Sequence, residues 1–303
     1  MSNSNTSAPS GTRTRQAGVD GLSCSDAQLA ALLQEDVPFG DLTTESLGLS
    51  GRAGQASFAA RGAMVACGIE ESARLFELCG ARARVLIPSG TRVAADGVLL
   101  MVEGDAAGLL KAWKTAQTLA EALSGMATAA RRIVDALRDA GFDLPLACTR
   151  KNFPGTRSLA AKAVRCGGAV MHRLGLSETL LVFPEHRGFM PADKQASAIA
   201  QLRRRQPEKR VVVEVGTEDE ALVMARAGAD VLQLERFTPP QLQALRGTLS
   251  AQGLHPMLAP AGGVTLSNAV DFARAGADFL VSSAPYFAPP ADIQVRLRPV
   301  AST

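Results

Sequence analysis

The sequence has little excess charge and few aromatic side chains, and both shortages limit what the protein can bind. Lysine and arginine outnumber aspartate and glutamate only by 32 to 29, and aromatic residues make up 4% of the 303 residues. Proteins that bind nucleic acids or acidic membrane surfaces concentrate positive charge on one face, often with interleaved aromatic side chains. The composition therefore argues against nucleic acid and against a membrane surface as partners.

Long apolar runs are also missing. No run approaches the length of about 20 apolar residues that a membrane-spanning helix needs. The segment Met1–Gln16 is rich in Ser, Thr and Asn and contains no apolar stretch of the kind found in a secretory signal peptide. We therefore expect a cytoplasmic protein in which residues 1–21 form a disordered tail.

Closely spaced cysteine pairs are absent as well. The five cysteines are Cys24, Cys67, Cys79, Cys148 and Cys166. Their spacing does not suit a metal site, and their odd number argues against a disulfide framework, so we expect all five to be reduced. Cys148 has two interpretations, a small buried side chain or a nucleophile whose thiol pKa is lowered by neighbouring cations.

An internal repeat in the carboxy-terminal half indicates the fold. The hexapeptide Ala-Arg-Ala-Gly-Ala-Asp occurs at residues 225–230 and again at 273–278. In each copy a Thr, Thr217 or Thr265, precedes apolar positions at helical spacing, a Gly ends the predicted helix, and an apolar run follows. Apolar runs that we expect to form strands also precede these helices, at 211–213 and 256–258. Alternation of this kind predicts a parallel α/β structure, and the period fits a (β/α) barrel.

Charged residues and glycines follow the predicted strands. Arg150 and Lys151 come after an apolar run at 144–148, and His172 and Arg173 come after another at 166–171, both of which we expect to be buried strands. Superposing the two repeats places Glu214 opposite Gly262 and Glu235 opposite Ser283. Ligands of parallel α/β folds bind at the carboxyl ends of the strands, so these residues should share one face.

The residue types at these strand ends indicate the ligand. Clustered cations make an anion site, and the Gly262-Gly263 pair would let backbone N–H groups approach a phosphate closely. Carboxylates among phosphate-binding groups suit Mg²⁺ or sugar hydroxyls. The sequence therefore predicts a site for a phosphosugar together with a divalent metal ion.

The amino-terminal third has a different pattern. We expect a short helix at 26–33, a turn-rich loop at 35–44, and short strands at 56–60, 84–87 and 98–102. These elements predict a small α+β domain over residues 22–115, completed by a strand from residues 285–303, and a barrel domain over residues 116–284. A long helix over about residues 109–140 should join the domains, with a break near Gly125 where the best helix formers are interrupted.

Several motifs, in this order, resemble those of the quinolinate phosphoribosyltransferase family, also called nicotinate-nucleotide pyrophosphorylase (carboxylating), over residues 22–298. The matching motifs are Gly40-Asp41-Leu42-Thr43-Thr44, Leu123-Ser124-Gly125-Met126-Ala127-Thr128, Thr149-Arg150-Lys151 with Pro154-Gly155, Cys166-Gly167-Gly168, His172-Arg173-Leu174-Gly175-Leu176, Glu214-Val215 and Ala261-Gly262-Gly263-Val264. The resemblance implies an α/β fold with a small sandwich domain plus an incomplete parallel (β/α) barrel. It also implies a homodimer, or a higher assembly of dimers, in which the amino-terminal domain covers the partner's active site.

The family's reaction joins 5-phosphoribosyl 1-pyrophosphate to a pyridine acid with Mg²⁺ and releases pyrophosphate and CO₂. By this resemblance, Arg150, His172 and Arg173 orient the acceptor, Lys151 holds the pyrophosphate, Glu214 and Glu235 hold Mg²⁺ or the ribose hydroxyls, and Gly262, Gly263 and Ser283 hold the 5-phosphate. Further substrate-binding positions are Thr149, Phe183, Ala261, Ser282 and, across the dimer interface, Lys114.

The acceptor end departs from the family pattern. Phe183-Pro184-Glu185-His186 stands where the family usually has Lys-Asp-Asn-His, so the lysine that grips a quinolinate carboxylate is missing. Lys114 replaces an Arg, Glu235 an Asp and Ala261 a Ser. The pattern is similar to the molybdenum-transport-associated, ModD-type subgroup. We therefore expect an anionic nitrogen heterocycle other than quinolinate as the acceptor.

Two other functions remain open. The chain could be a barrel aldolase or isomerase that uses Lys151 as a Schiff-base amine. It could instead be a non-catalytic, oxyanion-binding accessory protein of molybdenum handling. The presence of both Glu214 and Glu235 argues against the second alternative, because oxyanion binding alone has no use for carboxylates.

Overall fold

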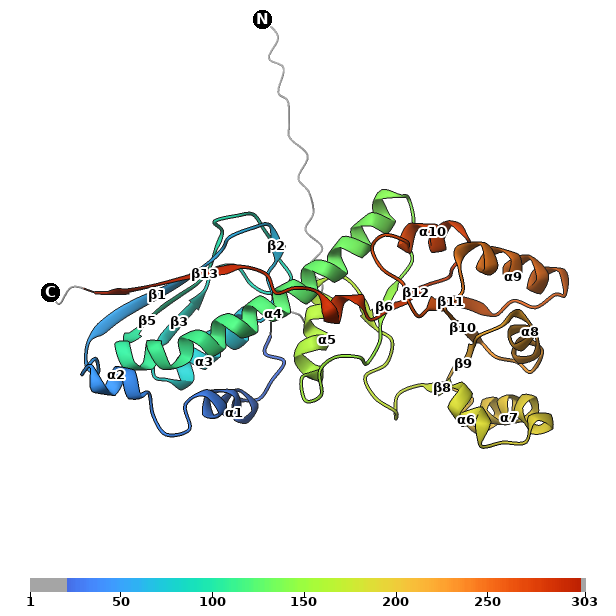
Figure 1. Cartoon of the computed structure of the whole chain (residues 1–303), viewed down its shortest axis with the longest axis horizontal. Coiled ribbons are helices and arrows are strands. Elements are labelled where there is room, and N and C mark those ends of the chain that lie inside the picture. Colours follow the sequence, from blue (N-terminus) through green and yellow to red (C-terminus); the bar gives the residue numbers. More distant parts are fainter. Residues whose placement is uncertain (1–20, 301–303) are drawn as a thin grey trace, which may run out of the picture.

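The computed structural model describes residues 21–300, which form two lobes that lie side by side and share one long helix (Figure 1). The tail that we predicted lies, except for residue 21, outside the described residues. No helix within residues 21–300 is both long enough and apolar enough to span a membrane.

The amino-terminal lobe is built on an antiparallel sheet with the strand order β13-β1-β5-β3. These strands are β1 (Ala53–Ala60), β3 (Arg82–Val85), β5 (Val98–Asp105) and β13 (Ile293–Pro299). The lobe also contains the paired strands β2 (Met64–Val65) and β4 (Arg92–Val93) and the helices α1 (Asp26–Asp36), α2 (Leu42–Ser46) and α3 (Ile69–Leu78). Alternate residues of β1, including Ala56 and Phe58, are fully buried in a core shared with α3.

Two expectations for this lobe meet different outcomes. Strand β13 returns from the end of the chain and pairs antiparallel with β1, from Ala60 opposite Ile293 to Gly54 opposite Pro299, so the prediction that a strand from residues 285–303 completes this lobe is confirmed. The turn-rich loop expected at 35–44 is shorter than predicted because helix α2 begins at Leu42. The Asp41 carboxylate caps this helix by accepting the backbone N–H groups of Thr43 and Thr44 at 3.1 and 3.0 Å.

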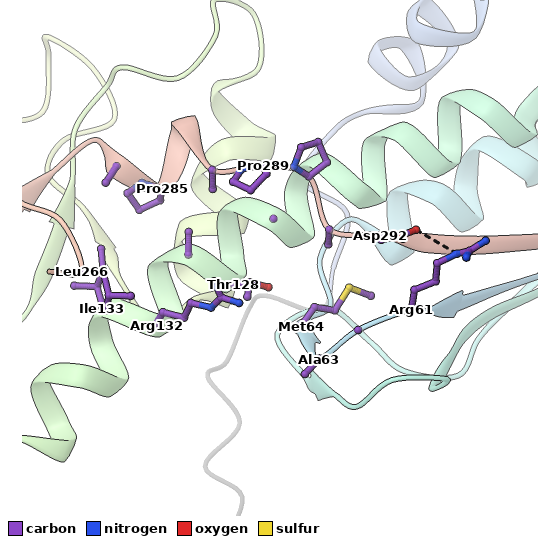
Figure 2. Close-up of a pocket in the computed structure, with 17 residues that line it drawn as sticks. Arg61, Ala63, Met64, Thr128, Arg132, Ile133, Leu266, Pro285, Pro289 and Asp292 are labelled. Atoms are coloured by element: carbon purple, nitrogen blue, oxygen red, sulfur yellow. Dashed lines mark ion pairs between the residues drawn. The ribbon is translucent and has the colours of Figure 1, made fainter.

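Helix α4 (Ala106–Asp139) is continuous over 34 residues, so the predicted break near Gly125 is wrong. Gly125 serves close packing instead. A Cβ atom placed on it would lie 2.3 Å from the backbone oxygen of Pro289, and the segment that carries Pro285 and Pro289 crosses α4 in Figure 2. Tertiary contact therefore explains a glycine that propensity alone assigns to a helix break.

The second lobe is an incomplete barrel of parallel strands. They are β6 (Leu146–Cys148), β7 (Val170–Met171), β8 (Leu180–Val182), β9 (Val211–Val215), β10 (Val231–Glu235), β11 (Met257–Ala261) and β12 (Leu280–Ser282). They form two ladders, β11-β10-β9-β8 and β12-β6-β7. A hydrogen bond of 2.9 Å from the N–H of Asp278 to the oxygen of Leu258 links the ladders on one side. On the other side β7 and β8 share no ladder within the described chain, so the barrel is open there.

Helices connect these strands. They are α5 (Arg157–Cys166), α6 (Pro184–Gly188), α7 (Ala192–Arg205), α8 (Glu218–Arg226), α9 (Pro239–Ala251) and α10 (Ala269–Arg274), with a 3₁₀ turn η1 (Ala284–Phe287). The internal repeat is confirmed as the units β9-α8-β10 and β11-α10-β12. Thr217 caps α8 as predicted, by accepting the N–H of Glu220 at 3.2 Å. Thr265 does not cap a helix, because α10 begins later, at Ala269, and the Asn268 side chain accepts the N–H of Thr265.

The predicted strand at 166–171 is mostly wrong. Cys166 ends α5, and Gly168, with a φ of 81°, makes the turn into β7, which has only two residues. Val170 is 48% exposed rather than buried. The reason is its position at the open edge of the barrel, where no following strand covers it.

A buried ionic cluster joins the lobes. The ammonium group of Lys162, on α5, lies 2.8 Å from a carboxylate oxygen of Glu70 and 2.7 Å from one of Glu71, both on α3. The Glu71 side chain is fully buried. Buried charges need such partners, so this cluster holds the barrel against the first lobe. Helix α4 has the same effect, since it contacts α3 in one lobe and α5 and α10 in the other.

Candidate active site

A cavity of about 1400 Å³ opens at the carboxyl ends of the barrel strands, and we call it the barrel-end cavity. Most residues that the sequence assigned to the site line it: Thr149, Arg150, Lys151, His172, Arg173, Phe183, Glu214, Glu235, Ala261, Gly262, Gly263 and Ser283. Lys114 and Ser282 are not among its lining residues. The strand-end argument therefore brought the correct segments of the chain together.

Side-chain alternation along the strands explains why these residues reach the cavity. In β10, Leu232 and Leu234 are fully buried in the core shared with the helices, whereas Gln233 and Glu235 line the cavity. Small residues such as Ala261 occupy the barrel interior beneath the rim. The barrel is therefore hollow at this end, since short side chains do not fill it.

One side of the barrel-end cavity carries cations without partners. Within residues 21–300, none of Arg150, Lys151 and Arg173 forms an ion pair with a carboxylate. Arg173 is only 5% exposed, and burial together with the neighbouring charge of Arg150 lowers the pKa of its guanidinium. A buried cation near another cation is stabilised by an anionic ligand.

His172 lies among these cations, and its surroundings favour the neutral form of its imidazole. Burial lowers the pKa of its imidazole below 6.5, and the charge of Arg173 lowers it further. Its backbone N–H donates to the oxygen of Cys148 at 2.8 Å, which fixes β7 against β6. A neutral imidazole at this position can donate one hydrogen bond and accept another.

Carboxylates line the opposite side. Gln233 donates a hydrogen bond of 2.6 Å from its amide nitrogen to Glu214. Burial raises the pKa of the Glu214 carboxyl, and the nearby Glu235 and Glu185 raise it further, while the Gln233 hydrogen bond and the charge of Lys151 act in the opposite direction. The cavity therefore has cations without carboxylate partners on one side and, on the other, carboxylates of which Glu235 is paired with Arg236.

The Gly262-Gly263 turn has the backbone freedom and the space that the sequence argument required. Both glycines have positive φ angles, 72° and 116°, which other residues rarely adopt. A Cβ atom on Gly262 would lie 2.4 Å from a carboxylate oxygen of Glu235. Ser282 supports this region from below, because its buried hydroxyl donates to the oxygen of Val264 at 2.6 Å and accepts the N–H of Ala284 at 3.0 Å.

The carboxylate pair fits only one kind of magnesium site. Among residues 21–300 no group of three or more His, Cys, Asp or Glu side chains could hold a metal ion. Mg²⁺ is usually bound by one or two carboxylates plus phosphate oxygens of the substrate. Glu214 and Glu235 therefore fit an ion that arrives with a pyrophosphate group, and they do not fit a permanent metal centre.

The part of the cavity at Phe183 is aromatic and acidic. The Phe183 ring stacks on His186 with centroids 5.8 Å apart. The backbone N–H of Phe183 donates to the Nδ1 atom of His186 at 2.9 Å. The guanidinium of Arg173 lies 5.7 Å from the centroid of the Phe183 ring. Glu185 also lines the cavity. This edge offers an aromatic surface and a carboxylate where the family pattern has a lysine.

Sequence reasoning missed some residues of the barrel-end cavity. Gln233, Glu185, Arg236 and Thr265 line it without having been assigned to it. Gln233 lies two positions before Glu235 in the same strand, so strand alternation was a usable signal. Arg236 forms an ion pair of 3.6 Å with Glu235.

Of two other expectations, one is wrong and the other is untested. Cys148 is fully buried, and burial raises the pKa of its thiol to about 12, so the nucleophile interpretation is wrong and the structural one holds. Lys114 lies on α4 in the first lobe, where its ammonium is 4.4 Å from the centroid of the Trp113 ring. A role for Lys114 in the site of a partner subunit stays a prediction.

A second cavity, of about 440 Å³, lies between the lobes and is shown in Figure 2. Thr128, Arg132 and Ile133 of α4 form one side, and an ion pair of 3.3 Å between Arg61 and Asp292 stands at the other. Its lining lacks the clustered cations and the glycine turn of the barrel-end cavity. The barrel-end cavity is therefore the candidate active site.

Comparison with known proteins identifies relatives of the chain. Family models described as the N-terminal and C-terminal domains of quinolinate phosphoribosyl transferase match residues 41–124 and 126–296. The chain is 47% identical over 258 residues to "Putative pyrophosphorylase ModD" of Rhodobacter capsulatus, covering 84% of this chain and 98% of that protein. It is 31% identical over 257 residues to nicotinate-nucleotide pyrophosphorylase (carboxylating) of Mycobacterium leprae, covering 83% and 89%.

Solved structures agree with these relatives. NadC from Streptococcus pyogenes superposes with a TM-score of 0.81 at 26% identity, covering 91% of this chain and 97% of that one. The nicotinate-nucleotide pyrophosphorylase of Francisella tularensis shares the fold, with a TM-score of 0.80 at 24% identity over 92% and 99% of the two chains. From its sequence, its two-lobed fold and its strand-end site, this chain belongs to the quinolinate phosphoribosyl transferase family.

Proposed function

We propose that the protein is a phosphoribosyltransferase that joins 5-phosphoribosyl 1-pyrophosphate to an anionic nitrogen heterocycle other than quinolinate, with release of pyrophosphate. One observation carries the proposal: a single cavity combines cations without partners, a carboxylate pair and a Gly-Gly turn. An anionic phosphosugar with ring hydroxyls complements all three.

The chemistry needs positioning and charge stabilisation rather than a covalent intermediate. The bond between the anomeric carbon and the pyrophosphate oxygen breaks with its electron pair leaving on pyrophosphate, and the ring nitrogen of the acceptor supplies the pair for the new bond. The sugar carbon is cationic in the transition state. Enzymes of this kind accelerate the reaction by fixing the reactants and by stabilising the separated charges.

Each side of the cavity has a role in this step. Lys151 holds the departing pyrophosphate. Glu214 and Glu235 accept hydrogen bonds from the ribose hydroxyls and stabilise the cationic sugar carbon. Gly262, Gly263 and Ser283 surround the 5-phosphate. Magnesium bound with pyrophosphate supplies further positive charge to the leaving group, and the same carboxylate pair would hold it.

The acceptor lies between Arg150, His172 and Arg173. Relative to the Lys-Asp-Asn-His of the family pattern, Phe183 removes a positive charge, Pro184 removes a negative one and Glu185 adds a negative one, so this segment is more negative by one charge. Quinolinate carries two adjacent carboxylates, and a carboxylate buried against an aromatic ring without a partner is costly. The acceptor is therefore a heterocycle with fewer negative charges than quinolinate.

Calorimetry with phosphoribosyl pyrophosphate and Mg²⁺ tests the proposal. We expect saturable binding, a rise in melting temperature by mass action, and loss of binding in Lys151→Ala. Lys209→Ala is the matched control, because Lys209 is exposed and precedes β9 at the opposite end of the barrel. Absence of binding, or binding that Lys151→Ala leaves unchanged, would contradict the phosphosugar assignment.

A screen of nitrogen heterocycles, measured by pyrophosphate release, then identifies the acceptor. Borohydride trapping of a carbonyl substrate on Lys151 would instead indicate the Schiff-base alternative. Molybdate binding in the cavity without any turnover would indicate the accessory-protein alternative.

A further inference from the structure

Gln233 places a buried amide on the wall of the barrel-end cavity. The proposed reaction gives this amide no role. The residue is 5% exposed, and it lines the cavity from the middle of β10. Its amide nitrogen donates to Glu214 at 2.6 Å, whereas its amide oxygen is buried and has no hydrogen-bond partner within the described chain. Native proteins pair nearly all buried polar atoms, so an unpaired one needs an explanation.

Packing does not explain the amide. The barrel interior around it is an apolar cluster formed by Leu181, Val212, Val231, Ala259, Ala261 and Val281. A methionine or leucine of similar length would suit these neighbours and would avoid the cost of a buried polar group. Glu214 is the partner of the amide nitrogen, so it is the amide oxygen that points to a polar partner that the protein itself does not supply.

The geometry fixes which end of the amide faces Glu214. Gln233 lies opposite Glu214 in the ladder of β9 and β10. An ionised carboxylate only accepts hydrogen bonds, so the amide NH₂ group faces Glu214 and the amide oxygen is left over. This oxygen can accept a hydrogen bond from a ligand in the cavity while the amide nitrogen keeps its bond to Glu214.

The surroundings indicate the chemistry of that ligand. Glu214, Glu235 and the amide oxygen of Gln233 are all hydrogen-bond acceptors on one side of the cavity. Arg236 lies on this side too, but it is paired with Glu235 at 3.6 Å, so an anionic group is drawn to Arg150 and Arg173 instead. A sugar ring with neighbouring hydroxyls is the neutral donor that this side complements.

We propose that Gln233 binds a ring hydroxyl of the pentose through its amide oxygen and orients the Glu214 carboxylate toward the same sugar through its amide nitrogen. This assignment rests on the proposed phosphoribosyl transfer. It makes Gln233 a further determinant of pentose recognition and not of phosphate or acceptor binding.

Calorimetry of the full chain without Mg²⁺ tests the assignment with two probes, ribose 5-phosphate and pyrophosphate. Gln233→Met keeps the length of the side chain and removes both hydrogen bonds. We expect it to weaken ribose 5-phosphate binding about tenfold, which corresponds to the loss of one good hydrogen bond, and to leave pyrophosphate binding unchanged. Gln206→Met, at an exposed position after α7, is the control and should change neither affinity.

A third probe, 2-deoxyribose 5-phosphate, identifies the hydroxyl. If Gln233 contacts the 2-hydroxyl, the wild type prefers ribose 5-phosphate and Gln233→Met loses that preference. If the other ring hydroxyl is the partner, Gln233→Met weakens both sugar phosphates equally. Both results support the assignment.

Other outcomes overturn it. Equal weakening of ribose 5-phosphate and pyrophosphate, or no weakening of either, would show that Gln233 has only a structural role. A loss that appears only when Mg²⁺ is present would assign the amide oxygen to the cation instead. If the wild type binds neither probe nor phosphoribosyl pyrophosphate, the proposed function itself fails, which is a different result.

Discussion

Single residues at the barrel rim have their chemistry set by burial as much as by residue type. Lys151 is exposed and free to follow a mobile leaving group, while Arg173 is buried beside another cation and can only be stabilised by an anion held in place. Cys148, one position before the same rim, is inert because it is fully enclosed. The distinction between a rigid orienting cation and a mobile one follows from these environments.

His172 should titrate below the ordinary histidine value of 6.5 because burial and then Arg173 disfavour its charged form. As pH falls below 6.5, the unfolded chain binds a proton that the native chain does not, so this residue makes stability fall with decreasing pH in that window. The chain has three histidines, so NMR titration of wild type and His172→Asn identifies the signal. A His172 pKa at or above 6.5 would contradict this environment. Binding of pyrophosphate should raise the pKa of His172.

Phe183 and Glu185 should exclude quinolinate. We expect the double variant Phe183→Lys/Glu185→Asn to raise kcat/KM for quinolinate by at least about tenfold, since recovery of about 1.4 kcal/mol of interaction is sufficient. Phe153→Lys is the control, because Phe153 is 78% exposed and does not line the cavity. Ordinary saturable turnover of quinolinate by the wild type would show that Phe183 does not limit the acceptor.

Secondary-structure elements in this fold are placed by close backbone contacts as well as by apolar faces. Helix α4 packs against both lobes, and a glycine lets the segment at Pro289 rest on it. The equivalent helices of the repeat, α8 and α10, differ in length and in capping although they share a hexapeptide. The same local sequence therefore ends helices in the same way and starts them differently, because the preceding loops differ.

Gly125→Ala should destabilise the protein, in contrast to the usual effect of this change in a helix. Alanine in an exposed helix is better than glycine by about 1 kcal/mol, but here the new Cβ would meet the Pro289 oxygen at 2.3 Å, and overpacking costs about 1–3 kcal/mol. Gly247→Ala in α9 is the matched control, because nothing lies within 4 Å of that position. In urea unfolding, the free energy of unfolding should fall for Gly125→Ala and rise slightly for Gly247→Ala. Equal rises for both variants would contradict the contact at Gly125.

At the scale of the whole molecule, a single chain leaves large apolar side chains uncovered. Phe39 and Phe189 are 98% and 93% exposed, and they lie in different lobes. Single exposed side chains do not define an interface. The homodimer, in which one subunit's first lobe covers the barrel-end cavity of the other, therefore stays a prediction from the family resemblance.

We predict a dimer in light scattering, with Lys114 of one subunit contributing to the site that contains Arg150 of the other. Lys114→Ala and Arg150→Ala should each be inactive alone. Mixed dimers of the two variants should regain activity, because one of their two sites then has both residues. A stable folded monomer, or mixtures that stay inactive, would contradict a shared site.

The sequence alone determined the features that depend on local order along the chain. The repeated hexapeptide and the alternation of predicted strands with helices predicted the parallel barrel units, and residues just after the strands, such as Arg150 and Glu214, were predicted to share a face. A strand that completes the first lobe was predicted within residues 285–303. These inferences held because the geometry of a strand and of a βα unit fixes where the next side chain lies.

Only the tertiary structure decided the features that depend on distant segments. Gly125 became a contact point because a segment far along the chain crosses it, Ser282 turned toward Val264 rather than the cavity, and Gln233 was left with a buried, unpaired oxygen. No local pattern records such neighbours. Burial, close approach and hydrogen-bond satisfaction are properties of the packed molecule, since they are set by which segments meet and not by their order in the sequence.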